Sequence, residues 1–343
     1  MTKVFISLLM GLLLVATIND SYAGGGRRNG TAGAQELLIP VGARGMAMDG
    51  AYITGLKGVE AMFYNPAGLG RTDKSAEALF SHMTYIADIG VSYAAVAVHF
   101  EGLGSLGFSI KSLDFGDIPV TTVEAPSGTG AMFSPTYVTM GVSYSNALTD
   151  RIQAGVNLKV TSEQIVRTSA TVFSFDAGVQ YHSLAGVEGL QVAVVLKNLG
   201  PQMSFQGPDL LRKATEGTAL RGEQYYAVEA ESFELPSQLE LGVAYQKQVM
   251  NDMGLVLSST FSNNNFSNDE YRLGGELNFK EMFFVRGGYT YMPQVEQDQE
   301  QIYGPTFGAG FNLNSGVDIA VDYAYRTTRY FDANHLFSVR FAF

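Results

Sequence analysis

Residues that carry nucleotide, metal or nucleophile chemistry are sparse in this chain. Gly102, Gly104 and Gly107 match the glycine spacing of a dinucleotide-binding loop. They lie at an expected hairpin turn that runs into another strand, so no helix N-terminus follows that could hold a phosphate. The match therefore does not indicate a nucleotide site.

Catalytic and metal-binding patterns are missing as well. The chain has no Gly-x-Ser-x-Gly nucleophile elbow and no cysteine, and its histidines show no metal-ligand spacing. The histidines are His82, His99, His182 and His335. We therefore expect no metal, no cofactor and no enzyme activity. One enzymatic alternative stays open, a hydrolase whose serine and histidine meet across neighbouring strands.

Composition favours a membrane barrel over a soluble domain. The 343 residues include 39 Gly, 18 Tyr and 22 Phe, and only 16% are charged, against about 25% in a typical soluble domain. Tyrosine can form the interfacial girdle in a chain without tryptophan. The formal net charge of −11 excludes nucleic acid as an expected partner, because binding it requires clustered Lys and Arg.

From about residue 76 onward, apolar side chains recur at every second position, which is the period of a β-strand. In the stretch 152–161, for example, apolar residues alternate with Gln153, Gly155, Asn157, Lys159 and Thr161. One face of each strand thus meets an apolar environment and the other meets water. Fourteen strands are predicted near 76–87, 90–100, 103–114, 134–146, 150–163, 169–182, 189–198, 236–249, 252–263, 269–280, 282–293, 303–313, 316–327 and 334–343.

The links between these strands alternate in length, as in transmembrane barrels, which have short turns at one end and long loops at the other. Short links are predicted at 101–102, 147–149, 250–251, 281 and 314–315, and long ones at 115–133 and 199–235. The link near Asp88 breaks the rule. The predicted fold class is all-β, a transmembrane antiparallel barrel of about fourteen strands in residues 76–343.

The two ends of the chain point to export and to barrel assembly. Residues 1–23 read as a signal peptide, with Lys3, an apolar run and Ser21-Tyr22-Ala23, so the mature chain is expected to start near Gly24. The last predicted strand places four apolar residues on one face, Phe337, Val339, Phe341 and Phe343. Such an ending resembles the signal read by the bacterial barrel-assembly machinery; the alternative is an ordinary amphipathic strand.

Residues 24–75 lack the alternation and form a separate segment, which we expect to plug the barrel or to lie below it on the periplasmic side. Its notable residues are Gly42, Arg44, Gly45, Gly50, Asn65, Pro66 and Gly68. Asn65 before Pro66 favours a turn or cap, and the glycines allow close backbone approach. They either fold the plug against the wall or gate a lateral or axial path for an apolar ligand.

Charged residues at inward-facing strand positions are expected to form ion pairs between wall and plug. They include Lys111, Lys159, Asp176, Lys197, Glu240, Glu276, Arg286, Asp318, Asp322, Arg326 and Arg340. Acidic residues gather in two outer loops, near 209–234 and 296–300. These loops are either solvated or bind divalent cations or a basic partner.

Two stretches of the segment carry a resemblance to a known family. They are Gly42-Ala43-Arg44-Gly45-Met46-Ala47-Met48-Asp49-Gly50-Ala51-Tyr52 and Glu60-Ala61-Met62-Phe63-Tyr64-Asn65-Pro66-Ala67-Gly68-Leu69. The pair resembles the N-terminal signature of the PorV/PorQ family of outer-membrane proteins, and Tyr-Asn-Pro-Ala-Gly-Leu is shared with the FadL family of transporters. Residues 37–41 and the ending 322–343 extend the resemblance. Asp49 departs from it, because the family's pattern has glycine there.

The resemblance implies a FadL-like barrel in the bacterial outer membrane, with both termini periplasmic, that serves type IX protein secretion. Its expected partners are outer-membrane lipid and lipopolysaccharide, the assembly machinery, an SprA-type translocon and the C-terminal sorting domains of secreted cargo. The alternative is a FadL-type transporter of hydrophobic small molecules through a plugged lumen.

Overall fold

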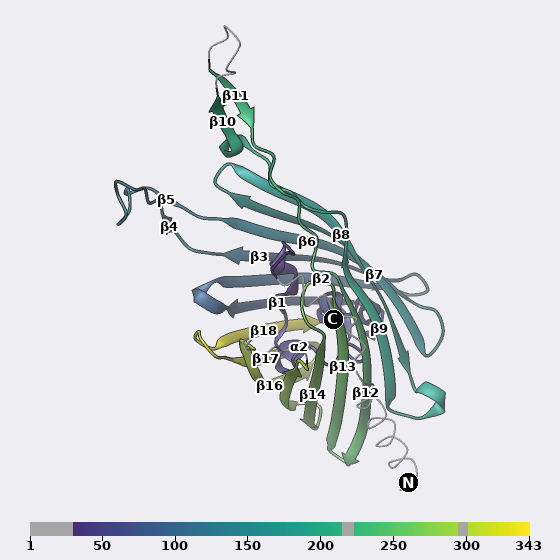
Figure 1. The fold of residues 1–343 in the computed structure, drawn as a ribbon. Helices are drawn as coiled ribbons and strands as arrows, with labels where there is room; N and C mark the ends of the chain where they lie inside the picture. Colours follow the sequence, from purple (N-terminus) through teal and green to yellow (C-terminus); the bar gives the residue numbers. More distant parts are fainter. Residues whose placement is uncertain (1–29, 215–222, 294–300) are drawn as a thin grey trace.

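The computed structural model describes residues 30–214, 223–293 and 301–343; the predicted signal peptide lies outside them. Fourteen strands form one closed antiparallel barrel, in which each strand pairs with the next barrel strand along the chain and the last pairs with the first (Figure 1). The predicted fold class is therefore confirmed. Closure pairs the backbone groups of every strand edge, which an apolar membrane requires.

The barrel strands, in chain order, have these bounds. They are β1 (Ala76–Thr84), β2 (Gly90–Phe100), β3 (Gly104–Asp114), β6 (Thr136–Ala147), β7 (Ile152–Ile165), β8 (Thr168–His182), β9 (Leu190–Leu199), β12 (Gln238–Met250), β13 (Met253–Asn264), β14 (Glu270–Phe279), β15 (Phe283–Tyr291), β16 (Tyr303–Ser315), β17 (Val317–Thr328) and β18 (Asn334–Ala342).

The predicted strand ends agree with these bounds to within a few residues. The first strand shows the largest difference, because it ends at Thr84 and not near 87. A short turn, η5 (Ile86–Asp88), follows, in which Ala87 and Asp88 adopt positive φ angles of 55° and 58°. Apolar periodicity does not report such a turn, so the alternation predicted a strand through it.

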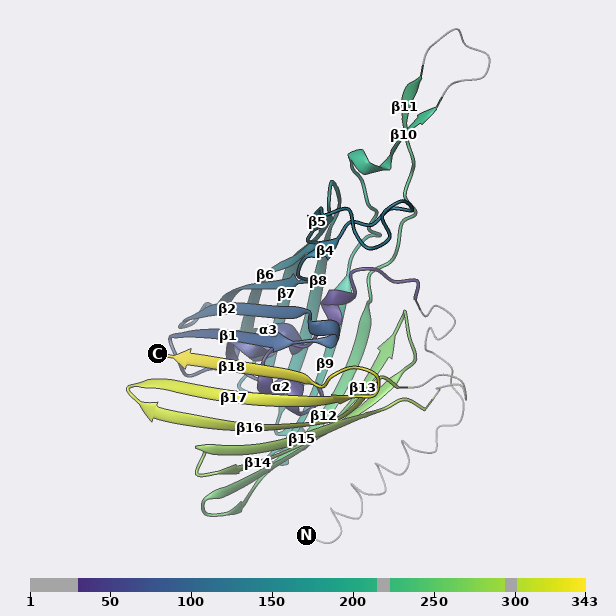
Figure 2. The ribbon, with the colours of Figure 1, turned by 90° about the vertical axis from the view of Figure 1, so that its left-hand side faces the viewer.

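The two longest links contain hairpins that the periodicity did not predict, β4 (Ile118–Pro119) with β5 (Met132–Phe133) and β10 (Leu211–Ala214) with β11 (Gln224–Ala227). Both extend beyond the barrel at the same end (Figures 1 and 2). We call this the long-loop end and the opposite end the short-turn end. Strands this short carry too few residues to show a period of two.

Loop length does not alternate at every link. Residues 166–167 join β7 to β8 at the long-loop end in a tight turn, where Val166 has a φ of 55°. At the short-turn end, residues 183–189 with η6 (Leu184–Gly186) form a longer link between β8 and β9. The predicted alternation thus holds for most links, and these two depart from it.

The barrel is apolar outside and polar inside, as the alternation predicted. On β7, Leu158 points outward and is 64% exposed, whereas its neighbour Asn157 points inward and is 4% exposed. Inward-facing polar side chains are buried because residues 30–75, which we call the inner segment, lie against them. The inner segment begins beside Glu234 at the long-loop end and joins β1 at the short-turn end, where Ser75 N–H donates to the Phe343 carbonyl.

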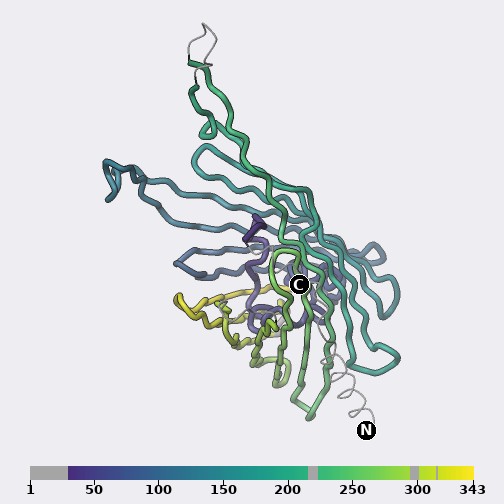
Figure 3. Tube along the Cα trace, in the orientation of Figure 1, coloured from purple at the N-terminus to yellow at the C-terminus, as the bar shows by residue number. Residues whose placement is uncertain are grey.

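The inner segment follows the inside of the wall in short helical turns (Figures 1–3). Its elements are η2 (Gln35–Leu38), α2 (Ala43–Ala47), η3 (Gly58–Glu60), α3 (Ala61–Tyr64) and η4 (Pro66–Gly70). Helix α2 contacts β15 to β18, η3 contacts β1 and β2, and η4 contacts β3 and β6 to β8. The segment therefore touches the wall on opposite sides of the barrel.

Glycines in the wall make room for this segment. A Cβ added to any of six inward-facing glycines, each on a different strand, would lie within 2.6 Å of an inner-segment atom. They are Gly107, Gly155, Gly178, Gly242, Gly288 and Gly308. The clearest case is Gly178 on β8, where a Cβ would be 2.0 Å from Asn65 Oδ1. At Gly155 and Gly288 the wall meets backbone of the segment, and at the other four glycines it meets a side chain. In all six cases the segment occupies the space that a Cβ would need, so only glycine fits.

We predict that Gly178→Ala destabilises the protein by about 1–3 kcal/mol, the range expected for overpacking a filled site. The matched control is Gly275→Ala on β14, where the nearest atoms to an added Cβ are 3.9 Å away. Denaturant titration of the barrel in lipid vesicles measures both free energies of unfolding. Equal losses in the two variants would contradict the close contact at Gly178.

Candidate functional site

The first signature stretch, residues 42–52, fixes the inner segment to the wall through a buried ion network. Arg44 on α2 donates from Nε and Nη2 to Glu276 on β14, at 2.8 and 2.7 Å. Glu276 also accepts from Arg286 Nε on β15 at 2.5 Å, and Arg286 in turn pairs with Asp322 on β17. Arg44 is thus the segment's member of a charge network that otherwise spans three wall strands.

Glu60 links the two signature stretches to each other. Its Oε1 accepts a hydrogen bond of 2.8 Å from the Gly45 N–H, and burial raises the pKa of the Glu60 carboxyl, an effect to which the charge of Asp322 adds. A side chain does not fit at Gly42 or Gly45, because a Cβ would lie 2.4 Å from Glu60 at the first position and 2.3 Å from Tyr64 at the second. The glycines of the motif therefore let η3 and α3 pack directly on α2.

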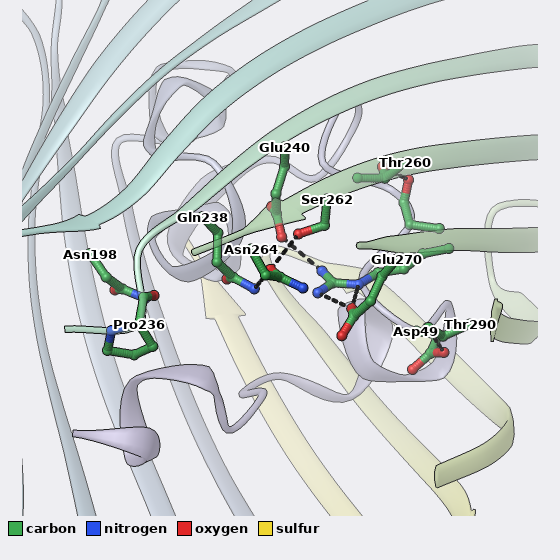
Figure 4. Close-up of polar contacts among 12 residues, drawn as sticks. Asp49, Asn198, Pro236, Gln238, Glu240, Thr260, Ser262, Asn264, Glu270 and Thr290 are labelled. Carbon is green, nitrogen blue, oxygen red and sulfur yellow. Dashed lines mark hydrogen bonds and ion pairs between the residues drawn. The ribbon is translucent and has the colours of Figure 1, made fainter. Parts of the chain in front are cut away.

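Asp49 occupies a backbone conformation that suits glycine, with a φ of 51°, and Gly50 follows with a φ of 71°. Aspartate is one of the few other residues that adopt this region readily. Its side chain also accepts a hydrogen bond of 2.5 Å from Thr290 Oγ1 on β15 (Figure 4). Asp49 therefore fits this position both through its backbone conformation and through its side-chain contact.

The second signature stretch centres on Asn65, which is fully buried. Its Oδ1 accepts from the Ala67 N–H at 3.1 Å and so caps η4, which begins at Pro66. Its Nδ2 donates to the carbonyls of Ile53 and Val179, each at 3.3 Å. Val179 belongs to β8, so the cap predicted from sequence is also a bond between segment and wall.

Gly68 continues the same packing. A Cβ there would lie 2.2 Å from the Leu56 carbonyl oxygen. Pro66 meets the wall directly, because its own carbonyl carbon lies 2.4 Å from where a Cβ of Gly155 would be. The residues singled out from the sequence, from Gly42 to Gly68, thus all lie against the wall. They form two groups on opposite sides of the barrel, one on α2 and one on η4.

A second charge network lies on β12 to β14 beside Asp49 and Gly50. Arg272 donates from Nη1 to Glu240 at 2.8 Å and from Nη2 to Glu270 at 2.7 Å (Figure 4). Nearby, Gln238 Nε2 donates to Asn264 Oδ1 at 2.8 Å. All three contacts are between wall residues.

The expectation that inward charges mostly pair with the plug is wrong for most of these residues. Arg44–Glu276 and Lys74–Asp318 join segment to wall. Lys159–Asp176, Arg272–Glu240, Arg286–Glu276 and Arg286–Asp322 join wall to wall. The reason is geometric, since inward-facing side chains on adjacent strands are within reach of each other whether or not anything fills the lumen. A long arginine side chain also reaches two strands away, as in Arg272–Glu240 and Arg286–Asp322.

Hydroxyl groups of the wall contribute contacts that the sequence did not single out. Three hydroxyls donate to carbonyls of the inner segment at 2.8–2.9 Å: Ser145 to Ala67, Thr260 to Ala51 and Thr306 to Ala47. A fourth, that of Ser338, accepts from the Ala43 N–H at 3.2 Å. Small polar residues at inward positions are the only signal for them, and that signal is common to all barrels.

A cavity of about 30 Å³ lies between η2, α3 and the inner faces of β2, β3 and β6 to β9. Its polar lining includes Lys111, Lys159, Lys197, Asp176 and Asn157, with Phe63 among its apolar lining. This volume suits on the order of one or two water-sized particles. The cavity therefore has no room for a larger solute.

The C-terminal residues predicted as an assembly signal lie on the outer surface of the last strand. Phe337, Phe341 and Phe343 are exposed, and Val339 is half-buried. Their strand pairs with β1 and closes the barrel. Their recognition by the assembly machinery stays a prediction, as does the location of the mature N-terminus, because Gly24 is outside the described residues.

Two histidines do contact serines across neighbouring strands. His82 Nδ1 is 3.0 Å from Ser92 Oγ, and His99 Nδ1 is 2.8 Å from Ser105 Oγ. Each pair consists of directly opposed residues in the strand register. Within residues 30–214, 223–293 and 301–343, neither histidine has a carboxylate hydrogen-bonded to its other nitrogen, so the third group of a catalytic triad is missing.

The same described ranges contain no cluster of His, Cys, Asp and Glu that could hold a metal ion. Nor do they contain a helix long and apolar enough to cross a membrane.

Comparison with known proteins supports the fold. No protein-family model matches the chain, and neither does any curated protein. Among solved structures, the P. putida toluene transporter TodX has a TM-score of 0.55 at 12% identity, covering 89% of this chain and 99% of its own. The monoaromatic hydrocarbon channel CymD has a TM-score of 0.53 at 12% identity, and a Pseudomonas aeruginosa FadL homologue 0.52 at 13%; each alignment covers 89% of this chain and 98% of the other. At these identities the likeness shows the fold alone, which is that of FadL-type barrels.

We predict that Arg44→Gln destabilises the protein by roughly 1–3 kcal/mol. The loss should be smaller than that for a buried ion pair whose remaining charge has no other partner, because Arg286 still neutralises Glu276. Arg167→Gln is the matched control. Arg167 pairs with Asp209 near the surface and is 69% exposed, so its loss should cost less than about 1 kcal/mol. Chemical unfolding compares the two variants, and equal stability losses would show that the Arg44 network does not anchor the inner segment.

Proposed function

We propose that this chain is an outer-membrane barrel that admits hydrophobic small molecules, and that the inner segment, residues 30–75, gates their path. The observation that carries the proposal is the inner segment itself, which lies against the inner wall on opposite sides of a FadL-type barrel. Barrels of this fold include a toluene transporter and a monoaromatic hydrocarbon channel. An apolar solute of that kind is the substrate class proposed here.

The contacts that hold the inner segment suit a gate. Apart from the chain connection to β1, the segment is held by hydrogen bonds, by the Arg44 and Lys74 ion pairs and by packing, all of which can re-form after a shift. Its turns are short, and no element exceeds five residues. A segment built from short turns can move in parts without unfolding the wall.

Orientation follows the rule for transmembrane barrels. The long-loop end, with the β4–β5 and β10–β11 hairpins, faces the exterior and the lipopolysaccharide surface, and the short-turn end faces the periplasm. The exposed apolar residues of the strands meet lipid. The C-terminal strand with Phe337, Phe341 and Phe343 is the element we propose that the assembly machinery recognises.

The gate can be tested with a disulfide, because the chain has no cysteine of its own. A Cβ on Gly274 would lie 3.1 Å from the Ala51 Cβ, close to the roughly 3.5–4.5 Å of a disulfide. We expect cells that produce the wild-type barrel to take up the apolar fluorescent probe N-phenylnaphthylamine several-fold faster than cells without it. Oxidised Ala51→Cys/Gly274→Cys should remove this gain, and reduction should restore it.

The double variant Ala51→Ser/Gly274→Ser is the matched control, since it fills the same space without a bond and should not respond to oxidant. Uptake by the wild type no faster than without the barrel would rule out the transport proposal. Full uptake through the oxidised cysteine variant would rule out gating by this segment and leave transport standing.

A second candidate is the PorV-like role in type IX secretion, which the two projecting hairpins favour. Tyr225 and Tyr226 on β11 are exposed, and Val123 between β4 and β5 is 94% exposed. Exposed aromatic and apolar side chains on an extended hairpin are typical of protein-binding surfaces. Residues 115–135 carry Asp117 and Glu124 and no Lys or Arg, so the surface suits a basic partner.

The secretion role predicts a specific capture. Affinity purification from native membranes should recover an SprA-type translocon or secreted proteins with C-terminal sorting domains. Replacement of residues 211–227 by a short glycine-serine link should abolish that recovery while the barrel still folds. Recovery of neither partner by the intact protein would exclude this second candidate.

A further inference from the structure

A group of three lysines faces the cavity between η2 and α3. Lys111 lies on β3, Lys159 on β7 and Lys197 on β9, and all three line the same cavity of about 30 Å³. Each is at most 9% exposed. Ionised groups are rarely buried without a counter-charge or a full set of hydrogen bonds, so the partners of each lysine decide what the cavity can hold.

Two of the lysines have their hydrogen-bond acceptors within the protein. Lys159 Nζ donates to Asp176 Oδ1 at 2.6 Å and also bonds to Asn198 Oδ1. Lys111 Nζ donates to the carbonyls of Glu36 and Ile39 at 2.6 and 3.2 Å, which holds η2 over the cavity. Both are therefore fixed in place.

Lys197 is different. It is 6% exposed, and among the described residues it has neither an ion pair nor a hydrogen bond. Its Nζ lies 4.7 Å from the ring centroid of Phe63 and 5.9 Å from that of Tyr64. Aromatic faces attract a cation but accept no conventional hydrogen bond from it, so its three donors are left without an acceptor.

The nearby carboxylates do not supply that acceptor. Asp176 Oδ1 already accepts from Lys159 and from the Asn198 N–H at 2.7 Å, and its Oδ2 accepts from Asn157 at 3.3 Å. Burial raises the pKa of the Glu36 carboxyl, which weakens its compensation of Lys111. The Tyr93 hydroxyl, on another residue that lines the cavity, has no hydrogen-bond partner among the described residues either. Asn157 Oδ1 and Glu36 Oε1 are buried acceptors that also have no hydrogen-bond partner among the described residues. The lining nevertheless carries three lysines against the single carboxylate of Asp176, so positive charge is in excess around this space.

We propose that the cavity binds one small monovalent anion, a halide or a carboxylate group, with Lys197 as its principal ligand and Lys111 and Tyr93 beside it. The volume suits a single ion of this size. All three ligands belong to the wall, and η2 and α3 of the inner segment also line the cavity. A bound anion therefore compensates positive charge beneath the segment and should stabilise the packed interior. This inference depends on the lysine geometry and not on the solute that the barrel transports.

The test is the thermal unfolding midpoint of the full barrel in detergent, at constant ionic strength, in the sodium salts of chloride, bromide, formate and the bulky morpholinoethanesulfonate. We expect the wild-type midpoint to be several degrees higher in chloride, bromide or formate than in the bulky salt. Lys197→Met should have the same midpoint in every salt. Lys247→Met, which alters an exposed lysine on β12, should respond as the wild type does.

The variant also separates binding from a merely structural role. In the bulky salt Lys197→Met should be at least as stable as the wild type, because it removes a buried charge without an acceptor, and the small anion should reverse that order. A response to halides assigns an inorganic ion, and a response to formate alone assigns a carboxylate. Equal wild-type midpoints in all salts, or a small-anion effect that persists in Lys197→Met, would overturn the proposal.

If Lys197→Met does not fold, crystals of the wild type grown in bromide give a direct answer. An anomalous peak within hydrogen-bond distance of Lys197 Nζ supports the site, and an ordered bromide structure without one overturns it.

Discussion

The inner face of a closed barrel must satisfy its polar groups without the solvent that an open pore would provide, and this constraint organises the whole molecule. The charges on β14, β15 and β17 form a chain through Glu276, Arg286 and Asp322, and Arg44 of the inner segment completes it. Serine and threonine hydroxyls around the wall bond to backbone of the same segment. The inner segment therefore fills the barrel and satisfies its polar groups, as the packed core fills a soluble domain.

Close contact between segment and wall depends on wall positions that carry no side chain of their own. Wall glycines such as Gly155 and Gly178 admit Pro66 and Asn65 at distances that no Cβ would allow. A surface joined in this way is specific, because a slip of one residue would place a side chain where only glycine fits. It is also made of many small contacts, and the proposed gate requires that some of them break while the rest remain. Both properties suit a gate.

The interior is not uniform in charge. On the side of β12 to β17 acidic and basic groups are matched, whereas the lysines on β3, β7 and β9 outnumber their carboxylate partners. Phe63, one residue before the Tyr-Asn-Pro-Ala-Gly-Leu stretch begins, lies against the ammonium groups of both Lys111 and Lys197. The second signature stretch thus bonds through Glu60 to Gly45, next to Arg44 of the matched network, and lies against the cationic side through Phe63. Movement of this stretch would change both environments together.

Sequence alone determined the strand count, the strand positions and which face of each strand is polar. The reason is that apolar side chains at every second position, over fourteen strands, are compatible with few folds other than a barrel. It also identified Asn65 as a cap and the glycines of residues 42–50 as points of close approach, since these roles are local. It missed the β4–β5 and β10–β11 hairpins, whose strands are too short for a period.

Only the tertiary structure decided which groups meet across the lumen. Arg44 and Glu276 are 232 positions apart, and neither local sequence predicts the other residue as a partner. The same holds for the wall glycines and for Lys197, whose missing partner becomes visible only when β9 is placed beside α3. Strand periodicity reports which way a side chain points, whereas its partners depend on barrel closure and on the path of the segment inside it, and these are long-range properties of the fold.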